Sequence, residues 1–268
     1  MMNLPHCQEI LVNEEAGVLH ITLNRPHKRN AMNSQLVEEI MAVFTAVEDD
    51  RTIRAIVLRG AEGHFCAGGD ISGMNKAAMT EQEAAQATWD FNRIFGRMIT
   101  QANEAPQVVI TLLEGAVMGG GFGLACISDI AIADKAAKFA LPETGLGIIP
   151  AQIAPFVVSR IGLTQARRLA LLGERLDGEQ ARDLGIVHYL THTVDEMDQR
   201  LKDVLKRVFR CAPEANAVTK KLMLQVGKVE HEALLDQAAD QFCASMRGAE
   251  GQEGTKAFME KRLPVWAS

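Results

Sequence analysis

Aromatic and basic side chains are both scarce in this sequence of 268 residues. Phe, Trp and Tyr together make up 5% of it, and Asp and Glu (34) outnumber Lys and Arg (28), for a formal net charge of −6 and a pI near 5.7. Nucleic-acid binding depends on clustered Lys and Arg, and single strands also need aromatic stacking platforms. We therefore expect no nucleic-acid partner, although a local basic spot could still bind a small anion.

Paired cysteines and long apolar runs are also missing. The five cysteines are scattered, odd in number and never in a CxxC pair, so the sequence predicts neither a disulfide framework nor a zinc site. No run of 18 apolar residues occurs, and the N-terminus lacks both a basic start and an apolar stretch. We expect a cytoplasmic protein in a reducing compartment, with no metal, no export signal and no membrane span.

What is present is an ordinary globular composition, 47% hydrophobic and 23% charged, on a chain long enough for a substantial core. Strand patterns alternate with helix patterns in the first half, which predicts an α/β architecture with buried sheets. Residues 71–105 have no readable pattern; their Met, Phe and Trp side chains fit either core or pocket. The expected strands are 17–23, 53–59, 108–113, 130–133 and 186–190, and the expected helices are 34–48, 122–127, 164–172, 179–184, 195–209, 213–226 and 234–246.

Three consecutive glycines, Gly119 to Gly121, follow the apolar strand 108–113 and precede a helix. Bare backbone at a helix N-terminus leaves N–H groups unsatisfied and favours negative charge. An isolated triple glycine is more often a tight turn without a ligand. The GxGxxG motif of dinucleotide-binding loops fails on spacing, because Leu124 and Ala125 occupy the places of its last glycine. The run is therefore a candidate oxyanion site.

A second glycine-containing segment, His64 to Asp70, also places small residues at a strand end, where an N–H could approach a ligand. Alone it is an equally weak signal. Together, the two segments suit a thioester whose oxygen becomes an enolate, because each preorganised donor stabilises that charge by about 3 to 4 kcal/mol.

One carboxylate, Glu143, lies among apolar and glycine residues in the segment FALPETGLGIIP. Partial desolvation would raise its pKa and let it exchange protons near neutral pH. The alternative is a solvated loop acid or a helix cap, which is the usual situation of a single Glu.

The order of these motifs resembles the enoyl-CoA hydratase/isomerase (crotonase) superfamily over essentially the whole chain, and Gly120 lies 23 residues before Glu143, as in that family. The resemblance implies a ClpP/crotonase-like spiral of ββα units, with a catalytic core over 1–200 and a helical trimerisation region over 201–268. It also implies an acyl-CoA substrate, no cofactor beyond the CoA of that substrate, and a homotrimer or dimer of trimers. The matching segments are NRPHKRNAMN, HFCAGGDISGM, EGAVMGGGFGLACISDIAIA, FALPETGLGIIPAQIAPFVVSRIG and FMEKRLPVW.

By the same resemblance, the amides of Ala67 and Gly120 form the oxyanion site and Glu143 is the catalytic acid/base. Arg29 and Lys261 would contact CoA, although a solvated surface charge is the alternative for both. Phe258 and Lys261 match positions that close over the CoA in such trimers. The full set expected to bind the substrate or its CoA comprises Lys28, Arg29, Ala31, Ala67, Gly68, Gly69, Asp70, Gly119, Gly120, Gly123, Phe258 and Lys261.

Gly123 departs from the usual hydratase pattern, which has a glutamate three residues after the oxyanion glycine. A single glutamate at the position of Glu143 resembles the 3,2-enoyl-CoA isomerases. The flanking sequence more closely resembles hydratases of 3-methylglutaconyl-CoA (leucine catabolism) and isohexenylglutaconyl-CoA (citronellol and geraniol catabolism), in which glycine at this position is normal. A glutamate there would repel the substrate's own distal carboxylate, and its removal would make room for a branched carbon 3.

We place hydration of isohexenylglutaconyl-CoA first among these activities. Hydration of 3-methylglutaconyl-CoA and double-bond isomerisation are the alternatives. A non-catalytic acyl-CoA or RNA binder is disfavoured, because Glu143 is retained and no basic patch is present.

Overall fold

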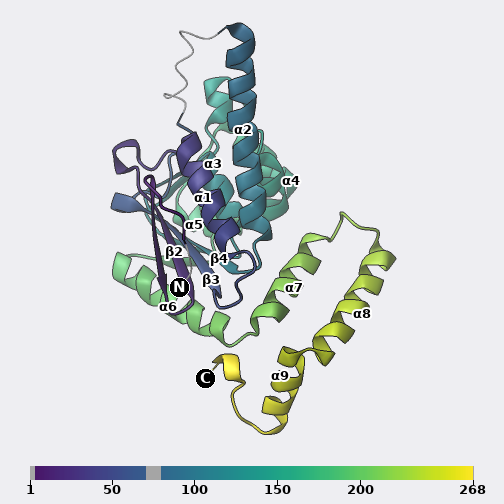
Figure 1. Ribbon diagram of the computed structural model, residues 1–268. Coiled ribbons are helices and arrows are strands. Elements are labelled where there is room, and N and C mark those ends of the chain that lie inside the picture. Colours follow the sequence, from purple (N-terminus) through teal and green to yellow (C-terminus); the bar gives the residue numbers. More distant parts are fainter. Residues whose placement is uncertain (1–3, 71–79, 268) are drawn as a thin grey trace.

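The computed structural model in Figure 1 describes residues 4–70 and 80–267. Its larger sheet has the strand order β1-β2-β3-β4-β6-β9, in which only β1 and β2 pair antiparallel. A smaller sheet pairs β5 parallel to β7 and β7 antiparallel to β8. The strands are β1 (Ile10–Glu15), β2 (Val18–Leu23), β3 (Ala55–Gly60), β4 (Val108–Leu113), β5 (Ala116–Met118), β6 (Ile130–Asp134), β7 (Lys138–Ala140), β8 (Arg175–Leu176) and β9 (Tyr189–Thr191).

Both faces of the larger sheet are covered by helices. Successive side chains of a strand point to opposite sides, so each strand contributes to both layers of packing. Val18, Val57 and Ile110 face α6 (Val194–Phe209) and pack against its buried apolar side chains. Their neighbours in the strands, such as Leu19 and Ile56, belong to the main core with α1 (Ser34–Val47), α2 (Glu81–Glu104) and α3 (Gly120–Ile127). The expected α/β class with buried sheets is confirmed.

The strands and helices expected from strong periodicity are present within a few residues of their predicted bounds, but weakly patterned ones were missed. The helix predicted to start at residue 122 starts at Gly120, and the one predicted over 164–172 is the end of α4 (Ala154–Leu172), which contains a non-helical Gly162. Strand β9 is shorter than expected and covers only 189–191. The strands β1, β5, β7 and β8 and the helix α9 (Ala249–Met259) were not predicted.

Helix α2 occupies most of the stretch that had no readable pattern; residues 71–79 of that stretch lie outside the described residues. A capping box formed by Thr80 and Glu83 starts the helix. Its buried residues, Gly96, Met98, Ile99 and Ala102, all lie in the second half. The first half has no buried side, so it shows no apolar period, and this explains why periodicity did not reveal the helix.

The C-terminal helices α7 (Pro213–Leu224), α8 (His231–Arg247) and α9 extend away from the sheet and its covering helices (Figure 1). Lys220 on α7 joins them to the core through an ion pair with Asp129 (2.5 Å) and a hydrogen bond to the carbonyl of Gln107 (2.7 Å). The expected boundary at residues 200 and 201 lies inside α6, which packs on the sheet, so the extension starts at α7 instead. The remaining short helices are η1 (Pro26–Lys28), η2 (Ala61–Gly63), η4 (Glu143–Leu146), α5 (Gly178–Asp183) and η5 (Val265–Ala267).

Bilayer-spanning helices require a long apolar stretch. Within residues 4–70 and 80–267, none of the helices combines the necessary length and hydropathy.

Candidate active site

A cavity of about 810 Å³ lies between α2 and the segment 142–153, and both glycine segments lie in its wall. Residues 71–105 were expected to form either core or pocket, and six residues of α2 from this stretch do line the cavity. The described lining is Met32, Ala67, Gly68, Gly69, Ala85, Thr88, Trp89, Phe91, Asn92, Phe95, Gly119, Gly120, Pro142, Glu143, Leu146, Ile148, Ile149, Pro150, Ala151, Gln152 and Ile153.

The triple glycine turns strand β5 into the N-terminus of α3, and its three amides have different environments. The N–H of Gly119 donates to the carbonyl of Ala140 (3.1 Å), and the N–H of Gly121 donates to the buried thiol sulfur of Cys66. The N–H of Gly120, the first residue of α3, has no protein acceptor in the described chain. Because Gly120 also lines the cavity, its amide is available to a ligand oxygen.

The second segment runs beside Met32 as a short parallel bridge. Met32 donates to the carbonyl of Gly68, and Asp70 donates to the carbonyl of Met32, both at 2.8 Å. Successive N–H groups of an extended chain alternate sides, so the amide of Gly69 faces away from Met32. No acceptor for that N–H is found among the described residues.

The expected donor at Ala67 is corrected by this geometry. Its N–H donates to the carbonyl of Arg29 at 3.0 Å and is therefore already used within the protein. Sequence reasoning placed the donor two residues too early, because it could not tell which amide of the extended segment turns toward the cavity. The available pair of amides is Gly69 and Gly120.

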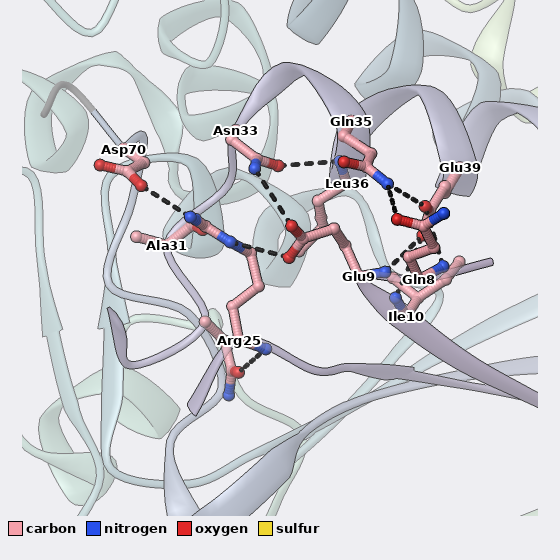
Figure 2. A network of polar contacts seen from close by, with 11 residues as sticks. Gln8, Glu9, Ile10, Arg25, Ala31, Asn33, Gln35, Leu36, Glu39 and Asp70 are labelled. Atoms are coloured by element: carbon pink, nitrogen blue, oxygen red, sulfur yellow. Dashed lines mark hydrogen bonds and ion pairs between the residues drawn. The ribbon is translucent and has the colours of Figure 1, made fainter. Parts of the chain in front are cut away.

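A buried ionic network holds the second segment in place (Figure 2). The guanidinium of Arg25 lies between two carboxylates, with its Nε 2.9 Å from Glu9 and its Nη2 2.9 Å from Asp70. Its Nη1 donates to the carbonyl of Ala31. Arg25 is only 7% exposed, so these contacts compensate its burial and fix the end of the Gly68-Gly69-Asp70 segment.

Glu143 is the first residue of η4, and its carboxylate reaches the triple glycine. A Cβ placed on Gly119 would stand 2.8 Å from Oε1 of Glu143, so only glycine leaves room there, and its φ of +50° adds to that requirement. The other oxygen, Oε2, is buried without a hydrogen-bond partner among the described residues. Burial raises the pKa of Glu143 above its ordinary value, as the sequence analysis expected.

Gly123 does not line the cavity among the described residues, contrary to expectation. A Cβ on Gly123 would meet Cγ2 of Ile153 at 2.5 Å and Cδ1 of Ile99 at 3.0 Å. Ile153 is 3% exposed and itself lines the cavity. The space that a side chain at residue 123 would need is therefore filled by isoleucine and is not left free for a substrate branch.

The residues expected to contact CoA lie outside the described cavity lining. Lys28 and Arg29 are exposed, at the end of η1 and immediately after it, whereas Ala31 is buried and offers its carbonyl to Arg25. Phe258, on α9, is 85% exposed, and Lys261 lies just beyond that helix. Within one chain these two C-terminal residues are not brought to the cavity.

Several residues at the site were not singled out from the sequence. Arg25 lies in the quoted NRPHKRN segment, and its flanking Pro indicated a turn without revealing the buried ion pairs. Asn92 lies in the stretch without a readable pattern, and Gln152 and Ile153 lie in the segment that carries Glu143 but were not named; only their position in the folded chain shows that they face the cavity.

Residues 13–268 match the family model described as enoyl-CoA hydratase/isomerase. The chain belongs to this family. Its structure is similar to that of AtuE from Pseudomonas aeruginosa, with 56% sequence identity, a TM-score of 0.93 and coverage of 97% of this chain and 100% of that chain. The expected crotonase fold is thereby confirmed.

Curated relatives include both reaction types of the family. A 1,2-epoxyphenylacetyl-CoA isomerase of Escherichia coli K12 is 32% identical over 260 residues, which cover 95% of this chain and 97% of the relative. A 2,3-dehydroadipyl-CoA hydratase of the same strain is 30% identical over 258 residues, covering 96% and 97%. The expectation of an acyl-CoA enzyme of the hydratase (hydro-lyase) type is confirmed at the level of the family.

Proposed function

We propose that this enzyme hydrates a 3-branched 2-enoyl-CoA that carries a terminal carboxylate, with isohexenylglutaconyl-CoA of acyclic-terpene breakdown as the first candidate. The observation that carries the proposal is a large, mostly apolar cavity in which one described carboxylate, Glu143, lies beside two free backbone amides. This arrangement provides a single acid/base next to a site for a thioester oxygen.

In the proposed reaction, the N–H groups of Gly69 and Gly120 donate to the thioester oxygen. Glu143 takes a proton from water while the water oxygen bonds to carbon 3, and the electrons of the double bond move onto the thioester as an enolate. Carbon 2 then takes a proton, from Glu143 or from water, and the product is a tertiary 3-hydroxy thioester. No step requires a metal or redox cofactor, and the CoA belongs to the substrate.

Raising the pKa of Glu143 suits this role. An ordinary solvated glutamate is a weak base for water at neutral pH, whereas partial burial brings its pKa closer to the working pH. The unpartnered Oε2 leaves a lone pair of the carboxylate for the attacking water.

The proposed substrate class depends on the absence of a second glutamate at residue 123. Ile153 and Ile99 occupy the space next to Gly123, and among the described lining residues Glu143 is the one acidic side chain. A substrate with its own carboxylate is thus spared a like-charge repulsion in a partly desolvated site. The relative named for 2,3-dehydroadipyl-CoA is named for the half-thioester of a dicarboxylic acid, which is consistent with such substrates in this family.

The competing activities are separated by one experiment. The protein is incubated in heavy-oxygen water with isohexenylglutaconyl-CoA, 3-methylglutaconyl-CoA, crotonyl-CoA and a 3-enoyl-CoA. We expect label uptake with the branched glutaconyl thioesters, fastest with the isohexenyl one. A faster reaction with 3-methylglutaconyl-CoA would move the assignment to leucine catabolism. Conversion of the 3-enoyl thioester without label uptake would support an isomerase and contradict hydration.

We further propose that the active form is a homotrimer or a dimer of trimers in the cytoplasm. The extended helices α7 to α9 carry apolar side chains that are largely exposed in one chain, and such patches usually mark an interface. Light scattering coupled to size exclusion would give the mass, and a monomer at micromolar concentration would contradict this. Examples on or near these helices are Met223, Val226, Phe242, Phe258 and Met259.

Assembly would also explain the CoA contacts expected for Phe258 and Lys261. Neither residue is among those that line the cavity of its own chain, so these contacts would come from a neighbouring subunit. Lys28 and Arg29 would supply positive charge to the phosphates from the same chain.

A further inference from the structure

Two side-chain amides meet in the wall of the otherwise apolar acyl cavity. Nε2 of Gln152 donates to Oδ1 of Asn92 at 2.8 Å, and both residues line the cavity. Apart from these two, the described lining has only Thr88 and Glu143 as polar side chains. A polar pair in an apolar wall fixes the position of a polar group of the ligand more often than it adds stability.

The backbone of α2 is adapted to this pair. Gly96 lies one helical turn after Asn92, and a Cβ on it would stand 1.9 Å from Oε1 of Gln152. A glycine in the middle of a helix costs roughly 0.5 to 1 kcal/mol relative to alanine. Here the missing side chain makes the space in which the partly buried Gln152 amide lies, which offsets the weaker helix propensity.

The pair retains N–H donors that have no protein acceptor within residues 4–70 and 80–267. The single hydrogen bond uses one N–H of Gln152, which leaves its second N–H and both N–H groups of Asn92 without an acceptor among the described residues. Three neutral N–H donors grouped in this way fit a carboxylate, which accepts several hydrogen bonds. No Lys or Arg side chain is among the described lining residues, but Nη1 of Arg93 stands 2.9 Å from the same Cβ position on Gly96, so a positive charge lies near the Gln152 amide.

The pair and the amides of Gly69 and Gly120 line the same cavity, so one acyl group could reach both. The ring of Phe95 stands 3.1 Å from a Cβ placed on Gly120, and the ring of Phe91 stands 3.8 Å from a Cβ placed on Gly69, so this turn of α2 lies beside both amides. Asn92 lies three residues before Phe95, and side chains at that spacing are about 5 to 6 Å apart at their Cβ atoms. Four bonds of about 1.5 Å, from carbon 1 to carbon 5, span a similar distance.

We infer that Asn92 and Gln152 form the subsite for the distal carboxylate of the substrate and set the preference for glutaconyl over neutral thioesters. This inference rests on the proposed function and specifies its substrate selectivity. Glu143 and the distal carboxylate would then be held apart, one at the glycine end of the cavity and the other at α2.

The test compares two thioesters that differ only by the carboxylate, 3-methylglutaconyl-CoA and 3-methylcrotonyl-CoA. The readout is the ratio of their kcat/KM values in the intact protein. Asn92→Asp and Gln152→Glu keep the size of each side chain and add a negative charge, so we expect each to lower the ratio by about 100-fold through repulsion. Asn92→Leu removes donors without adding charge and should lower it by about 10-fold.

Gln86→Glu is the matched control, because Gln86 lies on the same helix, is exposed and does not line the described cavity. It should leave the ratio within about twofold of the wild type, since a distant exposed charge is screened. Thermal unfolding of every variant separates loss of selectivity from loss of folding. An unchanged ratio in both acidic variants, or an equal loss for both thioesters in folded variants, would overturn the inference.

A failure of the proposed hydration is distinguished by binding. If the wild type hydrates neither thioester, calorimetry with the saturated thioesters 3-methylglutaryl-CoA and isovaleryl-CoA measures the same preference without turnover. Tighter binding of the glutaryl thioester, reversed in Asn92→Asp, would retain the carboxylate subsite and reject the hydration. Equal binding of the two thioesters by the wild type would reject the subsite.

Discussion

The two ends of the cavity are lined by different kinds of groups. At the thioester end, the groups that face the ligand are backbone amides of Gly69 and Gly120, set by strand pairing and by a helix N-terminus. At the acyl end the walls are side chains of α2 and of residues 146–153. Trp89, Leu146 and Ile149 there are each more than half exposed. The groups expected to act on the thioester thus belong to the backbone, whose position is fixed by the fold. The groups expected to select the substrate are side chains, several of them exposed.

The two ends of the cavity also differ in how deeply their supporting residues are buried. The thioester end rests on the fully buried Cys66, whose thiol accepts from the amides of Gly68 and Gly121, and burial raises the pKa of that thiol to about 12. The thiol therefore stays protonated and unreactive. The first half of α2, by contrast, has no fully buried residue. A substitution at the thioester end should accordingly change the rate, and one at the acyl end should change which substrate is used.

Glu143 lies where the two ends meet, and its replacement should have the largest effect. Glu143→Gln keeps the size of the side chain but removes the base, so kcat should fall by about 10³-fold, within the range typical of a lost acid/base. Affinity for a saturated acyl-CoA should change little, because binding does not use the proton transfer. Steady-state kinetics and calorimetry measure both quantities. Glu81→Gln, at an exposed site on α2, is the control, and near-normal turnover in Glu143→Gln would reject the mechanism.

The oxyanion amides can be tested by removing one donor. Gly120→Pro deletes the N–H at the first position of α3, where the helix tolerates proline. Gly120→Ala introduces the same Cβ, which crowds Cε of Met32 at 2.6 Å, but keeps the donor. We expect kcat of the proline variant to fall about 10²- to 10³-fold below that of the alanine variant.

Gly69→Ala tests whether a side chain at residue 69 is tolerated when its amide donor is kept. A Cβ there would meet only the Phe91 ring, at 3.8 Å, and the donor remains, so its rate should stay within about threefold of the wild type. Equal rates for Gly120→Pro and Gly120→Ala would show that the Gly120 amide does not act on the thioester.

The sequence predicted the thioester end better than the acyl end, and the reason is physical. Runs of glycine next to strands indicate where backbone can approach a ligand, and Glu143 lies in a recognisable apolar setting. The direction of a single N–H depends on pairing with Met32, a residue far away in the sequence, so Ala67 was chosen where Gly69 has the free amide. The motif therefore identified the segment 64–70, and only the tertiary structure identified which of its N–H groups faces the cavity.

The acyl end was unreadable because its determinants are long-range contacts. Gln152 meets Asn92 across 60 residues, through a space made by Gly96, and none of the three forms a local motif. Gly123 illustrates the same limit, because the missing side chain suggested an open space that Ile153 in fact fills. A glycine in a sequence indicates that a side chain is absent but does not indicate what occupies its place.

Packing around Gly123 gives a smaller but sharper test of that correction. Gly123→Ala should destabilise the fold by about 1 to 3 kcal/mol, because its Cβ would overlap Cγ2 of Ile153 at 2.5 Å. Ile153→Ala alone leaves a cavity and should also destabilise. The double variant should lose less than the sum of the two, since the new methyl enters the vacated space. Urea unfolding of the four proteins measures the coupling, and strict additivity would mean that residue 123 faces open space.

The smallest expected effect is on the pH dependence of stability. Burial raises the pKa of Glu143 in the folded protein, so the folded state favours its neutral form more than the unfolded state does. The resulting stabilisation is complete below the unfolded pKa and is lost as pH rises through the folded pKa, where the buried carboxylate must ionise. Glu143→Gln cannot ionise and should therefore have a higher Tm than the wild type at pH 8, with the difference narrowing toward pH 4.5. Thermal unfolding in matched buffers measures it. If the difference in Tm instead grew on acidification, the Glu143 carboxylate would be stabilised in its charged form. The thioester end of the cavity would then contain a partner for that charge.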